Sequence, residues 1–121
     1  MPEKKVGLIN GRTPQSVEEW RVAVALWKYR HEFHYQFQVF SIAGAKGTFF
    51  VDFLVTTTVP ESTPLEIFGK YWHEGQLGSE DRYRLVMIES ELGVAPKVIW
   101  GKDLQTQDDA NARILLEIGR G

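Results

Sequence analysis

The chain has 121 residues, of which 43% are hydrophobic and 25% charged, and it contains no cysteine. This length and composition predict one compact domain and exclude a disulfide framework, a thiolate zinc site and a cysteine nucleophile. The 14 Lys and Arg against 16 Asp and Glu give a net charge of −2, so nucleic acid could bind only through a local basic patch. No apolar stretch approaches the ~18 residues of a membrane helix, and no signal peptide opens the chain, so we expect a cytoplasmic protein without membrane contact.

A first helix is expected over residues 16–31. Ser16 and Glu19 have the spacing of a capping box at its start. Apolar residues at helical spacing predict its buried face, namely Val17, Trp20, Val24 and Trp27. Residues 1–12 are expected to be a flexible N-terminal segment, residues 119–121 a loose end, and residues 13–118 the single domain.

Two strands of a hairpin are expected over residues 33–42 and 48–57, on either side of a turn at Gly44 and Gly47. The first strand alternates, with Phe33, Tyr35, Phe37 and Val39 on one face and His34, Gln36 and Gln38 on the other. The second is dense in aromatic and β-branched residues, which predicts a strand that is central in its sheet and buried on both faces.

The rest of the chain predicts a strand at 65–68, a helix from Ser79 to Gly93, a strand at 97–100 and a helix over 108–118. For the first of these helices, Ser79 is expected to be the cap and Gly93 to end the helix in a left-handed conformation. Inward-facing residues are expected at Leu85, Ile88 and Leu92 in the first of these helices, and at Ile114, Leu115 and Ile118 in the second. The order α-β-β-β-α-β-α predicts an α/β fold, a mixed central sheet with flanking helices.

Two acidic residues stand within apolar strands. Asp52 shares a strand face with Phe50 and Leu54, and Glu66 lies between Leu65 and Ile67. An unpaired buried carboxylate costs several kcal/mol, so a hard divalent cation such as Mg²⁺ would relieve two of them on neighbouring strands. The alternative is that Asp52 lies at a strand end paired with an arginine and that Glu66 points to solvent.

The segment after Glu66 is rich in chemically active residues. Residues 69–74 place Lys70, two aromatic residues, His73 and a carboxylate directly after a strand, where loops commonly carry catalytic groups. A Trp-His pair also occurs in plain structural packing, so the functional interpretation competes with a structural one.

A series of short motifs in fixed order resembles a known family. They are Thr13-Pro14 with Glu19, Phe33-His34-Tyr35-Gln36, Val51-Asp52-Phe53, Leu65-Glu66-Ile67-Phe68-Gly69-Lys70-Tyr71-Trp72-His73, Asp81-Arg82 and Leu85 before Gly93. Over residues 13–118 the chain is similar to the very-short-patch-repair-like branch of the PD-(D/E)XK nuclease superfamily, and within it to small, often phage-encoded members. The resemblance implies a restriction-endonuclease-like fold, a DNA substrate, Mg²⁺ with Mn²⁺ as a substitute, and the host cytoplasm for a phage protein.

The resemblance also implies roles for individual residues. Asp52 and Glu66 correspond to metal ligands, and Ile67 is assigned to the same metal site. Glu19 corresponds to a third or water-mediated ligand, although its place in the capping box gives it a structural alternative. Gln36 corresponds to a polar neighbour of the metal site, and His73 matches a histidine after an aromatic pair.

One position departs from the family pattern. The superfamily has a lysine two residues after the acid, where this chain has the apolar Phe68. Lys70, two residues further on, is the first candidate to replace that lysine. His73 is the second, as a general acid or base near neutral pH.

Basic residues suggest where DNA would bind. Lys28 and Arg30 both lie near the end of the first predicted helix, and Arg82 lies near the start of the second. Cations at a helix C-terminus also offset the helix dipole, and Arg82 and Arg84 have a second interpretation as solvated surface charges.

Two function classes follow. The first is a Mg²⁺-dependent DNA endonuclease, in which the ion lowers the pKa of an attacking water. A domain with one such site nicks one strand, so double-strand cleavage would require a homodimer or two encounters. The second is a non-catalytic module of the same fold that binds DNA or a protein, suggested by Phe68 and by the acidic net charge.

Overall fold

The computed structural model describes residues 6–40, 48–69 and 78–121. The elements in chain order are α1 (Val17–Lys28), β1 (Phe33–Phe40), β2 (Thr48–Val55), β3 (Thr63–Phe68), α2 (Ser79–Leu92), β4 (Lys97–Trp100), the short 3-10 helix η2 (Gly101–Asp103) and α3 (Gln107–Ile118). The strands form one sheet in the order β1-β2-β3-β4. β1, β2 and β3 pair antiparallel, and β3 and β4 pair parallel. The prediction of an α/β fold with a mixed sheet is therefore confirmed.

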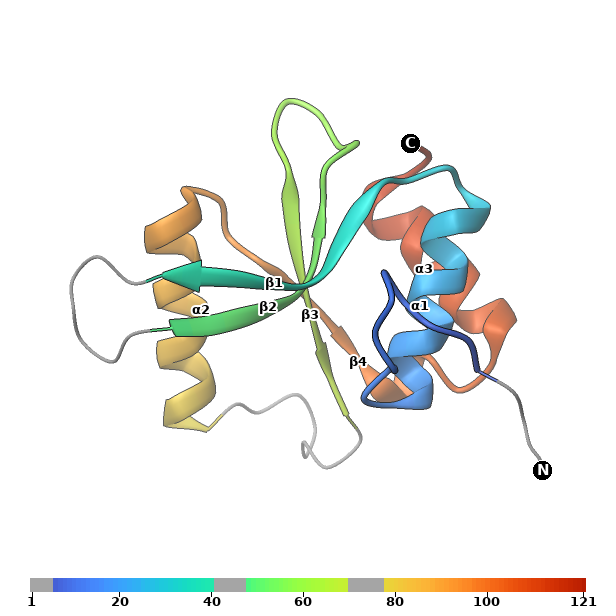
Figure 1. Ribbon diagram of the computed structural model, residues 1–121, viewed down its shortest axis with the longest axis horizontal. Coiled ribbons are helices and arrows are strands. Elements are labelled where there is room, and N and C mark those ends of the chain that lie inside the picture. The colour runs from blue at the N-terminus through green and yellow to red at the C-terminus, as the bar shows by residue number, and fades with distance from the viewer. Residues whose placement is uncertain (1–5, 41–47, 70–77) are drawn as a thin grey trace.

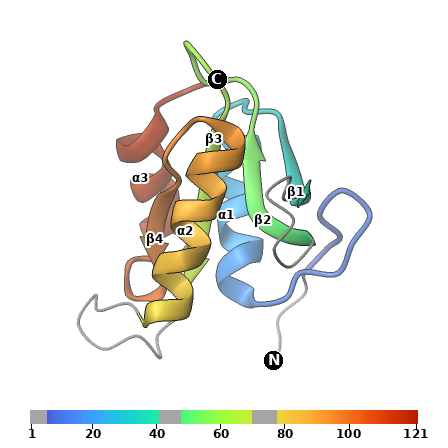
Figure 2. The same cartoon turned by 90° about the vertical axis from the view of Figure 1, so that its left-hand side faces the viewer.

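The helices lie on both sides of the twisted sheet. α1 and α3 pack together on one side and α2 lies on the other (Figure 1, Figure 2). The larger core lies on the side of α1 and α3, around Leu26, Phe53 and Ile114. The smaller core joins Val39 and Val51 of the hairpin to Ile88 of α2. Within the described ranges, no helix has both the length and the apolar character needed to cross a bilayer.

The buried face of α1 differs from the predicted one. Val17 and Trp27 are 36% and 44% exposed, so the predicted stripe was wrong at both of its ends. The buried residues are Glu19, Val22, Ala23, Ala25 and Leu26. Glu19, Val22, Ala23 and Leu26 have the i, i+3, i+4, i+7 spacing of a core-facing stripe, and the glutamate at its first position conceals it from a search for apolar residues.

The predicted ends of α2 and the predicted inner face of α3 agree with the structure only in part. Gly93 ends α2 with a left-handed φ of 78°, as predicted. The N-cap is Gly78, without a side-chain hydrogen bond, so the prediction that Ser79 caps the helix was wrong. Leu115 of α3 is 36% exposed and does not face inward as predicted, because the buried stripe runs through Ala110 and Ile114.

β2 is an inner strand of the sheet, between β1 and β3, as predicted. It contributes to the cores on both sides of the sheet: Phe53 and Val55 lie in the larger core and Val51 in the smaller one. The burial is nevertheless incomplete, which corrects the prediction in part, because Phe50 is 37% exposed.

Both predicted loose ends contact the domain where the structure describes them. Ile9 is fully buried and bridges to Arg12, and the Asn10 side chain accepts a hydrogen bond from the Tyr35 N–H at 2.7 Å. At the other end, the Gly121 N–H donates to the Tyr29 carbonyl at 2.8 Å, and Nε2 of His31 lies 2.7 Å from the Gly119 carbonyl. Residues 9–12 and 119–121 are therefore held against the domain.

Candidate active site

The pairing of β2 with both neighbouring strands is interrupted at Asp52. On one side, β1 pairs with β2 at Tyr35–Phe53 and again at Phe37–Val51, which leaves Gln36 and Asp52 opposite each other but unpaired. Gln36 has a left-handed φ of 56°, which removes it from regular strand geometry. On the other side, the pairing with β3 extends only as far as Phe53–Leu65. The break leaves backbone groups at Asp52 open to side-chain acceptors.

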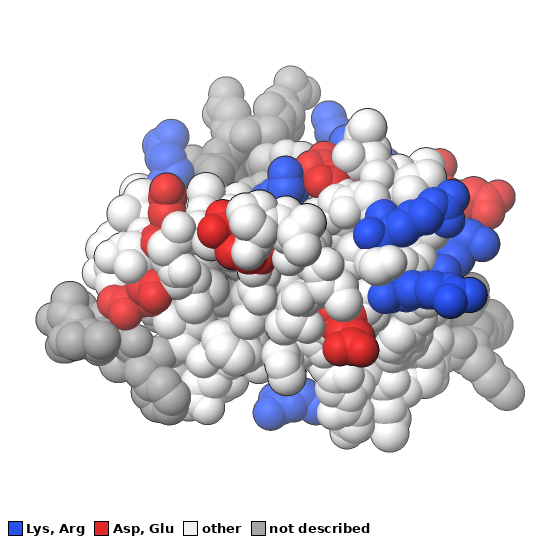
Figure 3. Space-filling model, turned by 90° about the horizontal axis from the view of Figure 1, so that it is seen from above, with Lys and Arg blue, Asp and Glu red and all other residues white. Residues whose placement is uncertain are grey.

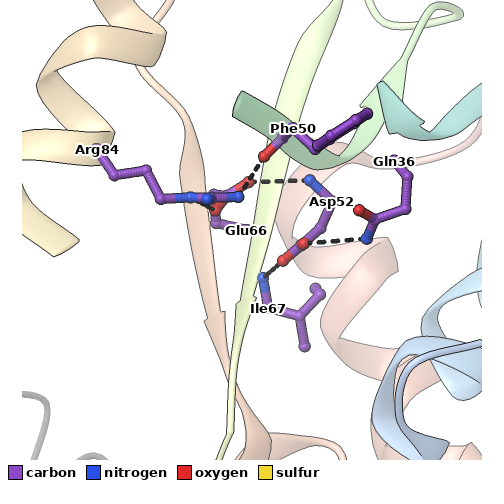
Figure 4. Close-up of polar contacts among 6 residues, drawn as sticks. All are labelled: Gln36, Phe50, Asp52, Glu66, Ile67 and Arg84. Carbon is purple, nitrogen blue, oxygen red and sulfur yellow. Dashed lines mark hydrogen bonds and ion pairs between the residues drawn. The ribbon is translucent and has the colours of Figure 1, made fainter. Parts of the chain in front are cut away.

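Asp52 and Glu66 fill this break by bonding to each other's strand. The Asp52 N–H donates to Glu66 Oε2 at 2.9 Å, and the Ile67 N–H donates to Asp52 Oδ2 at 2.8 Å. The Gln36 side chain makes a longer contact of 3.5 Å to Asp52 Oδ1. Figure 4 shows the Glu66 side chain directed toward α2 and the Asp52 carboxylate directed toward Ile67 and Gln36.

Arg84 of α2 supplies the positive charge of this cluster. Its Nε donates to Glu66 Oε1 at 2.8 Å and its Nη2 donates to the Phe50 carbonyl. Glu66 is 1% exposed, so the alternative in which it points to solvent was wrong. The other alternative paired Asp52 with an arginine, but the arginine of the cluster, Arg84, forms its ion pair with Glu66. Arg84 is therefore not a solvated surface charge, which was its second interpretation.

The two carboxyl groups are electrostatically strained. Burial raises the pKa of Glu66 to about 7, and the negative charge of Asp52 adds to this rise, while the hydrogen bond and charge of Arg84 oppose it. Burial also raises the pKa of Asp52, against the Ile67 hydrogen bond, the charge of Arg84 and the contact with Gln36. Two acids and one guanidinium leave an excess of negative charge when both acids are ionised.

Glu19 lies beside this cluster with a hydrogen bond of its own. The Ser16 hydroxyl accepts the Glu19 N–H at 3.1 Å, which is the first half of the capping box. The second half, a return of the Glu19 carboxylate to the Ser16 N–H, is not seen among the described contacts: the carboxylate accepts from the Tyr35 hydroxyl and from the Gln15 backbone. Burial raises the pKa of Glu19, as does the negative charge of Asp52, whereas the Tyr35 hydrogen bond lowers it. Glu19 is therefore a buried acid close to the cluster rather than a cap.

Tyr35→Phe is expected to lower the free energy of unfolding by about 2 kcal/mol at pH 8, because it removes a hydrogen-bond donor from a buried carboxylate. Urea unfolding followed by circular dichroism measures the change. Tyr29→Phe is the matched control, since no described residue forms a hydrogen bond with the Tyr29 hydroxyl. Equal stabilities of the two variants would contradict this role of Tyr35.

The structure brings some predicted site residues together and separates others. Asp52, Glu66, Ile67 and Gln36 form the cluster, and Glu19 adjoins it. Lys28 lies nine residues beyond Glu19, at the opposite end of α1, about 13 Å along the helix axis. Lys70 and His73 lie outside the described residues.

The predicted DNA-binding residues are exposed but lie in two places. Lys28 and Arg30 are near the C-terminal end of α1, where Lys28 and Arg120 both approach the Tyr29 ring. Figure 3, which shows the molecule from above, has a group of Lys and Arg side chains at its right-hand end. Arg82 is exposed on α2, two residues before Arg84.

Sequence interpretation missed two residues of the site. Arg84 stands four residues before the buried Ile88 and therefore on the inner face of α2. Tyr35 lies two residues after Phe33, on the same buried face of β1. A buried phenol usually has a polar partner. Both signals are visible in the sequence once the buried faces are known.

The oxygen donors of the cluster suit a hard divalent cation. The guanidinium of Arg84 lies between a carboxylate oxygen of Glu66 and the Phe50 carbonyl, so a cation already occupies a place bordered by oxygen atoms of two strands. Mg²⁺ commonly takes one or two carboxylates and completes its shell with water. In the part of the chain that the structure describes, no three acidic, histidine or cysteine side chains lie close enough to hold a metal ion together. The cluster offers two carboxylates, those of Asp52 and Glu66.

No protein-family model, curated protein or solved structure matches this chain. Function has to be inferred from the geometry and charge of the cluster.

Proposed function

We propose that the protein is a divalent-metal-dependent DNA endonuclease of the PD-(D/E)XK superfamily, similar to its very-short-patch-repair-like branch. The observation that carries this proposal is that Asp52 and Glu66 each bond to the other's strand where the pairing of β2 is interrupted, and that together they carry more negative charge than Arg84 balances. A metal ion that promotes phosphodiester hydrolysis is commonly held by one or two such carboxylates. The order of helices and strands, with a mixed sheet between α2 and the α1–α3 pair, is compatible with a restriction-endonuclease-like fold.

Each residue of the cluster has a role in this proposal. Asp52 and Glu66 would hold Mg²⁺ or Mn²⁺, which when bound activates water and neutralises charge on the phosphate. The Ile67 N–H and the Gln36 side chain fix the orientation of Asp52. Glu19 adds negative charge beside Asp52 and is itself oriented by Tyr35.

Further residues are proposed on the sequence alone. Lys70 or His73 would supply the positive or proton-donating group that Phe68 lacks. Lys28, Arg30 and Arg82 would contact the DNA backbone as exposed cations. A homodimer would place two such sites on a duplex for double-strand cleavage.

Incubation with supercoiled plasmid and with branched DNA tests the proposed activity. We expect nicked or linear product with millimolar Mg²⁺ or Mn²⁺, and none with EDTA. The Asp52→Asn protein, purified in parallel, controls for a contaminating nuclease. Absence of cleavage with every substrate and metal would overturn the proposal.

A non-catalytic nucleic-acid-binding or protein-binding module is the second candidate. Both Glu66 oxygens already accept hydrogen bonds from the protein, from the Asp52 N–H and from Arg84, so the cluster is satisfied without a metal. This candidate predicts that millimolar Mg²⁺ leaves the melting temperature unchanged and that DNA or a protein partner binds equally well in EDTA.

A further inference from the structure

The Arg84 guanidinium is held by hydrogen bonds along one edge, and along another edge it has hydrogen-bond donors without a described acceptor. Nε and Nη2, on one edge, donate to Glu66 Oε1 and to the Phe50 carbonyl (Figure 4). Nη1 has no acceptor among the described residues, and Nη2 keeps a second hydrogen. The Arg84 side chain is 33% exposed, so it is not enclosed completely by the described part of the protein.

We propose that Arg84 binds a phosphate of the nucleic-acid strand through its Nη1–Nη2 edge and so places a phosphodiester beside Asp52 and Glu66. The inference rests on the proposed function, since it takes DNA as the substrate. It assigns Arg84 to contact with the substrate, a role that goes beyond charge compensation for Glu66.

The geometry of the guanidinium suits a phosphate. Two parallel N–H donors match two non-bridging oxygens of a phosphate, and this paired geometry is specific to arginine. Because Glu66 and Phe50 already hold the other edge, little side-chain entropy remains to be lost on binding.

The charge of the cluster favours a cation at this position. Without a bound metal, a phosphodiester that approaches two carboxylates is repelled unless a positive group lies beside them. Among the described residues, Arg84 is the cation that forms an ion pair with the cluster, and its charge lowers the pKa of both Asp52 and Glu66. The substrate phosphate and Glu66 would then share one guanidinium from two sides.

Binding and cleavage of a fluorescent DNA oligonucleotide by Arg84→Gln and Arg84→Lys test the proposal. We expect Arg84→Gln to weaken oligonucleotide binding about tenfold or more in EDTA and to lower kcat/KM by at least that factor. Arg84→Lys keeps a charge opposite Glu66, so it stays folded, but it lacks the paired donors and recovers only part of the loss.

Arg113→Gln is the matched control. Arg113 has a similar exposure of 31% and also pairs with carboxylates, but these are Asp103 and Glu117 rather than the acids of the cluster. We expect its DNA binding and cleavage to equal those of the wild type. Full binding by Arg84→Gln, or a loss no larger than that of Arg113→Gln, would overturn the phosphate contact.

The salt dependence of binding separates this contact from a structural role. Loss of one phosphate contact makes the negative slope of log K against log salt shallower by about 0.7–0.9. A purely structural change leaves this slope unaltered. If the wild type binds DNA but never cleaves it, the proposed activity fails and the slope still decides for or against Arg84. If Arg84→Gln binds Mn²⁺ more tightly with unchanged DNA binding, Arg84 competes with the metal and the phosphate proposal is wrong.

Discussion

Asp52→Asn is expected to lower divalent-metal-dependent cleavage by about a thousandfold or more, with an unchanged or slightly raised melting temperature. The loss arises because a neutral amide is a poor ligand for a hard divalent cation. The fold is spared because the asparagine oxygen can still accept the Ile67 N–H, and because the change removes a negative charge that raises the pKa of Glu66. Plasmid nicking rates and thermal unfolding measure the two effects.

Asp103→Asn is the matched control for this variant. The Asp103→Asn variant also loses one negative charge. Asp103 lies on η2, is 31% exposed and pairs with Arg113 rather than with a residue of the cluster. We expect wild-type cleavage from it. Retained cleavage by a folded Asp52→Asn protein would remove Asp52 from the site, and a large drop in melting temperature would identify Asp52 as a structural residue.

The acidic pair could be found in the sequence because of its chemical contrast with its surroundings. Asp52 and Glu66 stand among apolar strand residues, and a carboxylate there has to be compensated. The compensating residue could not be found in the same way. Arg84 comes from α2, 18 residues after Glu66, and its partner depends on how that helix packs on the sheet.

The geometry at Asp52 was also beyond the sequence pattern. Alternation predicts that Asp52 points to one face of a regular strand, together with Phe50 and Leu54. The structure instead interrupts the pairing on both sides of Asp52, next to a left-handed Gln36, and the carboxylate reaches the Ile67 N–H. Nothing in the local sequence indicates a left-handed glutamine, since this backbone conformation is uncommon for any residue with a side chain.

The prediction of the buried face of α1 was wrong for a related reason. The apolar residues at helical spacing are Val17, Trp20, Val24 and Trp27, and a pattern of apolar residues alone cannot include a glutamate. The true stripe begins with Glu19, a charged residue whose burial depends on Tyr35 from β1. Polar groups that join distant elements are therefore what the sequence pattern hides, and Glu19 with Tyr35 is one such pair beside the site.

Conformational stability is expected to fall as the pH rises from 5 to 8, by about 3 kcal/mol at most from Glu66. In the folded state the pKa of Glu66 is raised to about 7 from its ordinary 4.5, so the folded protein holds this proton more tightly than the unfolded chain does. The resulting stabilisation is complete below about pH 4.5 and is lost as the pH rises through 7. The raised pKa of Asp52 acts in the same direction.

Urea unfolding at a series of pH values without divalent metal measures this dependence, and Glu66→Gln isolates the contribution of Glu66. The glutamine keeps an acceptor for Arg84 and for the Asp52 N–H but cannot ionise, so the decline in stability between pH 5 and 8 should become markedly shallower. Glu117→Gln, which removes an acid that is 25% exposed on α3, should leave the decline as it is in the wild type. A wild-type stability that rises over this pH range would show that Arg84 and the backbone donors compensate Glu66 fully, and the excess negative charge on which the proposed metal site depends would then be absent.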